Sequence, residues 1–231
     1  MSDHSFVSPA FRARVRLIAV PIALVFGRLG LTPNALTIVG FIGTCVAAVA
    51  AATQNWVLAG LLVIVFGIFD LFDGALARAT NQVSKFGAFL DSTLDRTGEN
   101  LVLAGVAVGC AWIGFPLGTL VAVLAMSFAS VVTYTRAKAE ALGLHGEVGL
   151  APRSERTVLL AAGLILAGLT GVAPIDCGNL FCVNNPSPPG QWVLVVALGL
   201  IAILSAITVV QRILHVKHQL DSSTSTTSSN R

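Results

Sequence analysis

Charged side chains are scarce in this chain of 231 residues. Only 11% of the residues are Asp, Glu, Lys or Arg, whereas 55% are hydrophobic. A soluble domain of this size carries about 25% charged residues. The deficit excludes a string of soluble modules, and the long apolar runs place the chain among polytopic membrane proteins. The net charge of +3 is also too small to indicate a nucleic acid partner.

Histidine and cysteine are few as well, with four of each. The histidines form no cluster with the spacing of metal ligands. Cys45 and Cys110 lie inside apolar runs, where they are ordinary packing residues. Cys177 and Cys182 lie in a more polar segment, Asp-Cys-Gly-Asn-Leu-Phe-Cys. Two interpretations stay open for them: a disulfide, if their side of the membrane is oxidising, or two free thiols.

Six apolar runs have about the 20 residues that a helix needs to cross the hydrocarbon of a bilayer. An amphipathic helix at the membrane surface is predicted over residues 8–29, because the apolar run there is short, contains Pro21 and follows three arginines that can face lipid headgroups. A signal anchor is the alternative for that segment. The six predicted transmembrane helices cover 33–52, 56–79, 86–111, 117–142, 155–173 and 190–214.

These elements predict an all-α fold class, a polytopic membrane protein with six transmembrane helices preceded by an amphipathic juxtamembrane helix. Residues 1–32 form the N-terminal cytoplasmic segment with the interfacial helix, and 33–214 form the six-helix catalytic domain. The Ser/Thr-rich residues 215–231 form a cytoplasmic tail that we expect to be disordered. Gly105 and Gly109 have the spacing of small residues that supports helix packing in a dimer.

The positions of Lys and Arg predict the orientation in the membrane. These residues lie before the first span, around the second and fourth connections and after the last span, and the first, third and fifth connections have none. By the positive-inside rule, both termini and the second and fourth connections face the cytoplasm. The pattern is self-consistent only with an even number of spans. We expect a multi-pass protein of the plasma membrane.

Four aspartates lie where the second span ends and the third begins. A carboxylate inside a span costs about 2.5–3.5 kcal/mol on insertion scales, so it indicates a functional site. Asp70 and Asp73 are three residues apart and Asp91 and Asp95 are four apart, so each pair shares one face of its helix. The connection is short, so the helices should be antiparallel neighbours whose acidic faces converge near the cytoplasm.

Converging carboxylates repel one another unless a cation lies between them. Oxygen ligands favour Mg²⁺ or Mn²⁺ over zinc, and four carboxylates suit two ions that act on a phosphoryl group. One alternative is a set of buried ion pairs with Arg78, Lys85 and Arg96, which leaves one acid without a base. A second alternative is an ion or solute transporter with an intramembrane acidic site. Transporter sites usually lie near the bilayer midplane, whereas these acids lie close to a basic edge.

The run Asp70-x-x-Asp73-Gly74-x-x-Ala77-Arg78, then eight residues and Gly87-x-x-x-Asp91-x-x-x-Asp95, resembles the signature of the CDP-alcohol phosphotransferase family at all of its fixed positions. The resemblance implies a fold with six spans, a surface helix before them, cytoplasmic termini and a homodimer. It also implies a reaction of phospholipid biosynthesis, in which an acceptor alcohol displaces CMP from a CDP-linked lipid, CDP-diacylglycerol or CDP-archaeol.

The resemblance assigns roles to individual residues. Asp70, Asp73 and Asp91 are expected to hold metal on the pyrophosphate. Asp95 is the expected catalytic base, which takes the acceptor's proton and shares the second metal. The residues expected to bind the CDP-lipid are Asn34, Ala35, Leu36, Thr37, Gly74, Ala77, Arg78, Ser84 and Gly87.

A second basic group, Arg136, Lys138, Arg153 and Arg156, indicates which acceptor is used. It predicts a pocket for the phosphate of an anionic acceptor beside the metal site, although anchoring residues at the cytoplasmic edge would give the same pattern. The spacing resembles the branch of the family that makes phosphatidylinositol phosphate, or its archaeal ether-lipid counterpart, from inositol 1-phosphate. Phosphatidylglycerophosphate synthesis from glycerol 3-phosphate is the alternative.

Overall fold

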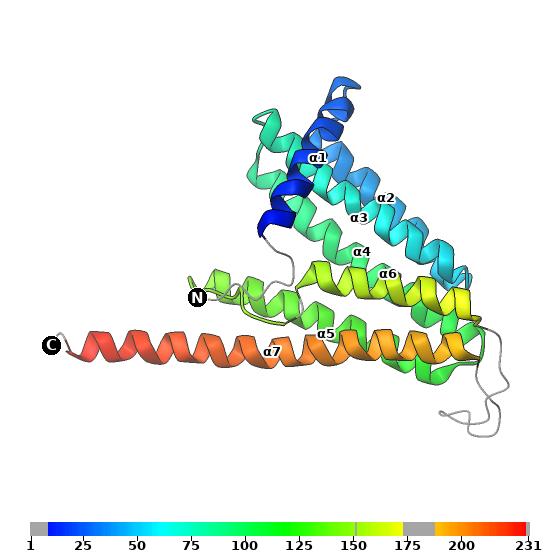
Figure 1. Ribbon diagram of the computed structural model, residues 1–231. Helices are drawn as coiled ribbons and strands as arrows, with labels where there is room; N and C mark the ends of the chain where they lie inside the picture. The colour runs from blue at the N-terminus through cyan, green and yellow to red at the C-terminus, as the bar shows by residue number, and fades with distance from the viewer. Residues whose placement is uncertain (1–8, 151, 173–187, 230–231) are drawn as a thin grey trace.

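The computed structural model describes residues 9–150, 152–172 and 188–229, and over these residues the chain folds into helices without strands. The predicted all-α class is therefore confirmed. Cys177 and Cys182 lie outside the described residues. The helices, shown in Figure 1, are α1 (Pro9–Arg28), α2 (Pro33–Ala52), α3 (Trp56–Ala79), α4 (Lys85–Trp112), α5 (Pro116–Ala141), α6 (Arg153–Thr170) and α7 (Pro189–Ser229).

Local chemistry sets where several helices begin. The Oγ atom of Thr32 accepts a hydrogen bond from the amide of Ala35, and Pro33 occupies the first turn of α2. The Oγ atom of Ser84 accepts one from the amide of Gly87 in the same way at the start of α4. These capped starts place α3 and α4 on either side of a short turn, as the sequence predicts.

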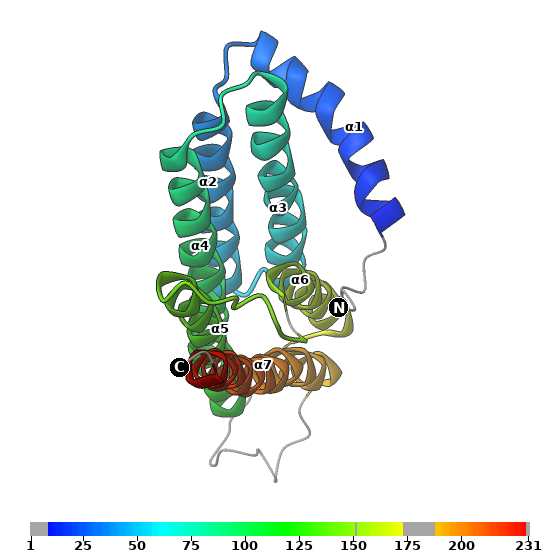
Figure 2. The ribbon, with the colours of Figure 1, turned by 90° about the vertical axis from the view of Figure 1, so that its left-hand side faces the viewer.

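The helices form two groups that converge at one end and diverge at the other (Figures 1 and 2). One group contains α2, α3 and α4, with α1 packed along α3, and the other contains α5, α6 and α7. A core cluster of buried apolar residues from α2 to α7, with Trp56, Leu103 and Leu198 among its larger members, fills the convergent end. A smaller cluster, with Leu36 and Leu76, joins α1, α2 and α3.

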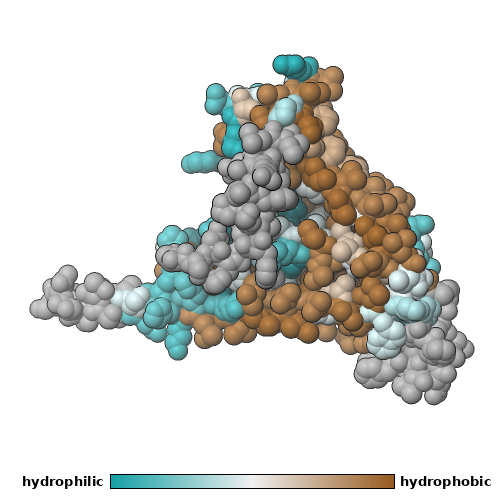
Figure 3. Space-filling view, in the orientation of Figure 1, coloured by the Kyte–Doolittle hydropathy of each residue, from teal (hydrophilic) through white to brown (hydrophobic). Residues whose placement is uncertain are grey.

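Four of the helices are long and apolar enough to cross a membrane by themselves: α2, α3, α5 and α7, the last measured over Pro189–Ser222. Their outer faces expose apolar side chains, including Val49, Leu61 and Val196. Figure 3 shows this apolar surface as a broad band with hydrophilic residues at its ends. The other two predicted spans, α4 and α6, are helices as expected but carry several charged residues in their N-terminal parts.

The C-terminal region differs from the prediction. The sequence favours disorder after residue 214, whereas α7 continues as a helix to Ser229. A tertiary contact supports the continuation: Gln219 donates from Nε2 to the carbonyl of His145 (2.8 Å) and accepts from the amide of His145 at Oε1 (3.1 Å). A composition-based prediction of disorder does not account for such a contact, which ties α7 to the loop between α5 and α6.

Gly105 and Gly109 pack against α2 of the same chain. Their spacing had suggested a contact between two chains of a dimer. A Cβ atom at Gly105 would lie 2.2 Å from the carbonyl oxygen of Ala48, and one at Gly109 would lie 2.4 Å from that of Ala51. The absence of side chains lets the backbones of α2 and α4 approach closely. This close approach holds α4, which carries Asp91 and Asp95, against α2.

We expect Gly105→Ala to lower the stability of the fold by about 1–3 kcal/mol, because the added methyl group overpacks the contact between α2 and α4. Thermal unfolding in detergent measures the effect. Gly199→Ala is the matched control, since a Cβ atom there meets only Val121, at 4.0 Å. An unfolding temperature for Gly105→Ala equal to that of the wild type would contradict the prediction.

Candidate active site

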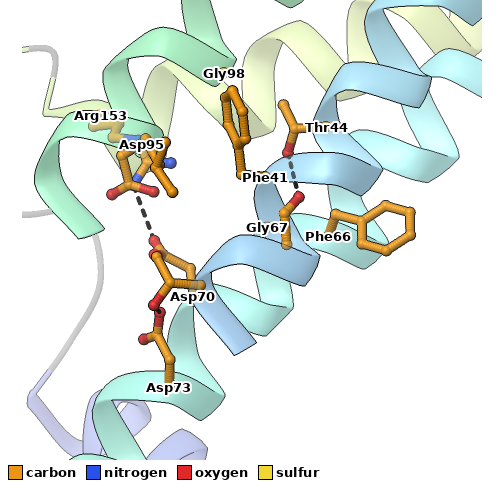
Figure 4. A pocket seen from close by; sticks show the side chains of 12 residues that line it. Phe41, Thr44, Phe66, Gly67, Asp70, Asp73, Asp95, Gly98 and Arg153 are labelled. Atoms are coloured by element: carbon orange, nitrogen blue, oxygen red, sulfur yellow. Dashed lines mark hydrogen bonds and ion pairs between the residues drawn. The ribbon is translucent and has the colours of Figure 1, made fainter. Parts of the chain in front are cut away.

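Three of the four aspartates form a compact acidic cluster between α3 and α4. Asp70, Asp91 and Asp95 each present a carboxylate oxygen, and these atoms all lie within 4.8 Å of one another. Figure 4 shows Asp70 of α3 facing Asp95 of α4. The predicted convergence of the two acidic faces is therefore confirmed for these three residues.

Asp73 lies one helical turn from Asp70 and has a different partner. Its side chain is 5% exposed, and its Oδ2 accepts a hydrogen bond of 2.6 Å from the Oγ1 atom of Thr37. Thr37 is on α2, so this bond connects the predicted nucleotide segment to the acidic face of α3. Both residues line the cavity next to Asp70 and Asp95 that Figure 4 shows.

The donor set fits a hard divalent cation. Asp91 Oδ1 is buried and has no hydrogen-bond partner in the structure, and an unsatisfied buried carboxylate oxygen is costly unless something binds it. Arg153 gives the cluster one positive charge, through Nη1, which donates to Asp70 Oδ2 (2.9 Å) and to Asp95. One guanidinium does not balance the carboxylates of this cluster. Their oxygen atoms are the ligands that Mg²⁺ and Mn²⁺ prefer.

A pocket of about 290 Å³ opens beside this cluster, between the first turns of α2 and α4 and the last turns of α3. Asp73 and Asp91 line one part of it. Seven of the nine residues predicted to bind the CDP-lipid also line it: Asn34, Thr37, Gly74, Ala77, Arg78, Ser84 and Gly87.

The two remaining predicted residues lie elsewhere. Leu36 is fully buried in the cluster that joins α1, α2 and α3, so it is a core residue and not a pocket residue. Ala35 donates its backbone amide to the cap of α2 and does not line the pocket. The period of the helix explains both, because residues 34 and 37 share a face that 35 and 36 do not. Gln82 and Val83, in the turn between α3 and α4, line the pocket without a sequence signal.

Two glycines shape the pocket wall. A Cβ atom at Gly74 would lie 3.3 Å from Nη1 of Arg78, so the guanidinium lies against the bare backbone of α3. A Cβ atom at Gly87 would lie about 3 Å from both Ser84 Oγ and Asn34 Oδ1. The missing side chains therefore let Arg78 lie against the backbone of α3, and Ser84 and Asn34 lie close together beside the backbone of α4, in the wall of the pocket.

The four basic residues that the sequence groups into one acceptor pocket have different environments in the structure. Arg153 is at the acidic cluster. Arg156 is buried and bound to Glu99. Arg136 is half-exposed and pairs with Glu140 (2.8 Å) and Glu147 (2.5 Å).

Lys138 is exposed at the end of α5. Arg212 of α7 is a further basic residue of this region, and in the sequence it is only one of the charges that follow the last predicted span. It is buried, donates to the carbonyls of Val132 and Val148, and lies within electrostatic reach of Arg136 and Arg156.

The family model for CDP-alcohol phosphatidyltransferases matches residues 30–203. This chain belongs to the CDP-alcohol phosphatidyltransferase family. The match covers the residues of both the acidic cluster and the pocket beside it. The family is one of transferases, so the transporter that the intramembrane acids alone left open is not supported.

Several relatives of this transferase are similar over almost the whole chain. The phosphatidylinositol phosphate synthase of Cutibacterium acnes is 36% identical, over 92% of this chain and 98% of its own length. The archaetidylinositol phosphate synthase of Pyrococcus horikoshii is 35% identical, over 91% of this chain and 96% of its own. The crystal structure of the Mycobacterium tuberculosis phosphatidylinositol phosphate synthase with CDP-DAG bound has a TM-score of 0.71, with 32% identity, and covers 86% and 93% of the two chains.

We expect Asp91→Asn to weaken Mn²⁺ binding by at least about tenfold, because a neutral amide replaces the buried carboxylate whose Oδ1 has no other partner. Titration of the detergent-solubilised protein with Mn²⁺, followed by electron paramagnetic resonance of the free ion, measures the affinity. Asp221→Asn, at an exposed position of α7, is the control and should bind Mn²⁺ like the wild type. Equal affinity in the two variants would remove Asp91 from the metal site.

Proposed function

We propose that this transferase moves the phosphatidyl or archaetidyl group of a CDP-linked lipid to inositol 1-phosphate, with release of CMP. The observation that carries the proposal is the position of Arg153, a cation suited to a phosphate-bearing acceptor, in contact with two carboxylates of the acidic cluster. The names of relatives that match more than nine tenths of the chain support the same acceptor.

The residues around the pocket suggest how the CDP-lipid is held. Arg78 provides paired donors for a phosphate beside Gly74, where the bare backbone permits close approach. Asn34 and Ser84 lie close together next to Gly87 and offer polar groups to the nucleotide. Asp70, Asp73 and Asp91 would hold Mg²⁺ or Mn²⁺, two ions in all. When bound, the metal neutralises charge on the pyrophosphate and on departing CMP.

The transfer itself needs a base and a positioned acceptor. Asp95 takes the proton of the acceptor hydroxyl as its oxygen bonds to the phosphorus that carries the lipid. The bond from that phosphorus to the oxygen of CMP breaks, and CMP leaves with the bond's electrons. Arg153 holds the acceptor's phosphate next to Asp95, since its Nη1 already contacts that carboxylate and its Nε is buried without a partner. A free alcohol is a poor nucleophile, so the positions of Asp95 at the hydroxyl and of Arg153 at the phosphate both contribute to the rate.

We further propose that all six helices α2–α7 cross the plasma membrane, with the active site and both termini on the cytoplasmic side and α1 at the membrane surface. The charges of α4 lie between Lys85 and Glu99, which leaves its remaining residues up to Trp112 uncharged, and those of α6 lie in its first turn. The remaining parts of both helices are apolar, which supports a crossing with the charged ends toward a basic edge. A homodimer stays a prediction.

A panel of acceptors tests the proposal. Purified protein with CDP-diacylglycerol or CDP-archaeol and Mg²⁺ or Mn²⁺ should release CMP with inositol 1-phosphate, and much less with glycerol 3-phosphate, serine or free inositol. The lipid that gives the higher rate identifies the donor. Preference for glycerol 3-phosphate would reassign the acceptor, and no CMP with any acceptor would contradict the proposed function.

We expect Asp95→Asn to lower kcat by about 10²–10⁴-fold, the usual contribution of a general base. Binding of the CDP-lipid should persist, because Asp95 does not line the pocket beside the cluster. Single-turnover CMP release and calorimetric titration with a soluble CDP-diacylglycerol analogue measure the two properties. Full activity of Asp95→Asn would show that another group takes the proton.

A further inference from the structure

Two ion pairs connect α4 with α6 at the edge of the active site. Asp95 of α4 pairs with Arg153 of α6, and Glu99 of α4 pairs with Arg156 of α6. Asp95 and Glu99 are four residues apart, and the two arginines are three apart, so each helix presents its two charges on one face. The pairs therefore form two successive connections between the same helix faces, and only the first belongs to the site described above.

The Glu99–Arg156 pair is more buried and has more hydrogen bonds between its partners than the Asp95–Arg153 pair. Arg156 binds both oxygens of Glu99, with Nε at 2.7 Å from Oε1 and Nη2 at 2.9 Å from Oε2. The two side chains are 3% and 8% exposed, compared with 36% and 20% for Arg153 and Asp95. A bidentate, charge-assisted pair that is shielded from water has one well-defined geometry.

Arg153 is less fully engaged than Arg156. Its Nη1 is shared by Asp70 and Asp95, while its Nε is buried with no hydrogen-bond partner in the structure. To bind the acceptor's phosphate, the Arg153 side chain must give up a carboxylate partner. This exchange requires that the first turn of α6 stays in place. Arg156 lies in that same turn, three residues on.

We propose that Glu99 is a positioning residue for the acceptor site. By holding Arg156 it fixes the first turn of α6 against α4, so that the guanidinium of Arg153 stays next to Asp95, where the acceptor's phosphate would bind. This inference rests on the proposed function and deepens it. It also moves Arg156 from the predicted acceptor-binding group to the framework that supports that group.

Steady-state kinetics of Glu99→Gln test the proposal. The variant keeps the shape of the side chain and removes its charge. We expect the KM for inositol 1-phosphate to rise at least about tenfold, as for other residues that support a site from behind. The KM for the CDP-lipid and the affinity for Mn²⁺ should change less than about twofold. Glu155→Gln, which removes a charge from the same turn of α6, is the matched control and should keep the wild-type acceptor KM.

A second variant separates positioning from folding, because Glu99→Gln removes the carboxylate that balances the buried charge of Arg156. Replacing both residues in the double variant Glu99→Leu/Arg156→Leu removes the pair without leaving a buried charge. Its unfolding temperature should be close to that of the wild type, while its acceptor KM stays raised. A wild-type acceptor KM in the folded double variant would overturn the inference while leaving the proposed function intact. Absence of CMP release by the wild-type protein would instead reject the proposed function.

Discussion

The repulsion among carboxylates that meet between α3 and α4 is the constraint around which the site is built. Asp70, Asp91 and Asp95 are half-buried and present oxygens within 4.8 Å of one another, where like charges interact more strongly than in bulk water. Such a cluster persists in a fold only with compensating positive charge. Arg153 provides a part, and the buried, unpartnered oxygen of Asp91 indicates where a metal would provide the rest. The cation is thus a structural requirement of the site as well as a chemical one.

Close packing makes that convergence available. Gly105 and Gly109 bring α4 against α2, and Gly43 lets the ring of Phe66 on α3 lie against the backbone of α2. With α2 in contact with both neighbours, the acidic faces of α3 and α4 are held at a fixed separation. Thr37 on α2 then reaches Asp73 directly. The acidic site therefore depends on these small residues, since bulkier residues would separate the carboxylates and weaken any shared metal site.

The metal half of the site could be predicted from the sequence because it is local. The i, i+3 and i, i+4 spacings fix which face each aspartate occupies, and the short turn fixes that the faces meet. The basic half could not, because the partners of Arg153, Arg156 and Arg212 come from distant segments. Glu99 is 57 positions from Arg156, and Val132 is 80 positions from Arg212. The helical C-terminal part of α7 could not be predicted from the sequence for the same reason, since its contact with His145 is tertiary.

The different origins of the two halves bear on how an acceptor is chosen. The pocket beside the acidic cluster, with Arg78 in its lining, is built from α2, α3, α4 and the turn between α3 and α4, whereas Arg136, Arg153 and Arg212 belong to α5, α6 and α7. The two groups of helices diverge away from the core cluster of buried apolar residues (Figure 1), so this apolar packing does not set their spacing at the divergent end. The ion pairs between α4 and α6 instead hold the two groups of helices together near the site. An acceptor that binds to Arg153 therefore meets a cation whose position depends on electrostatic contacts across the gap, and changes in those contacts can alter acceptor choice without disturbing the metal ligands.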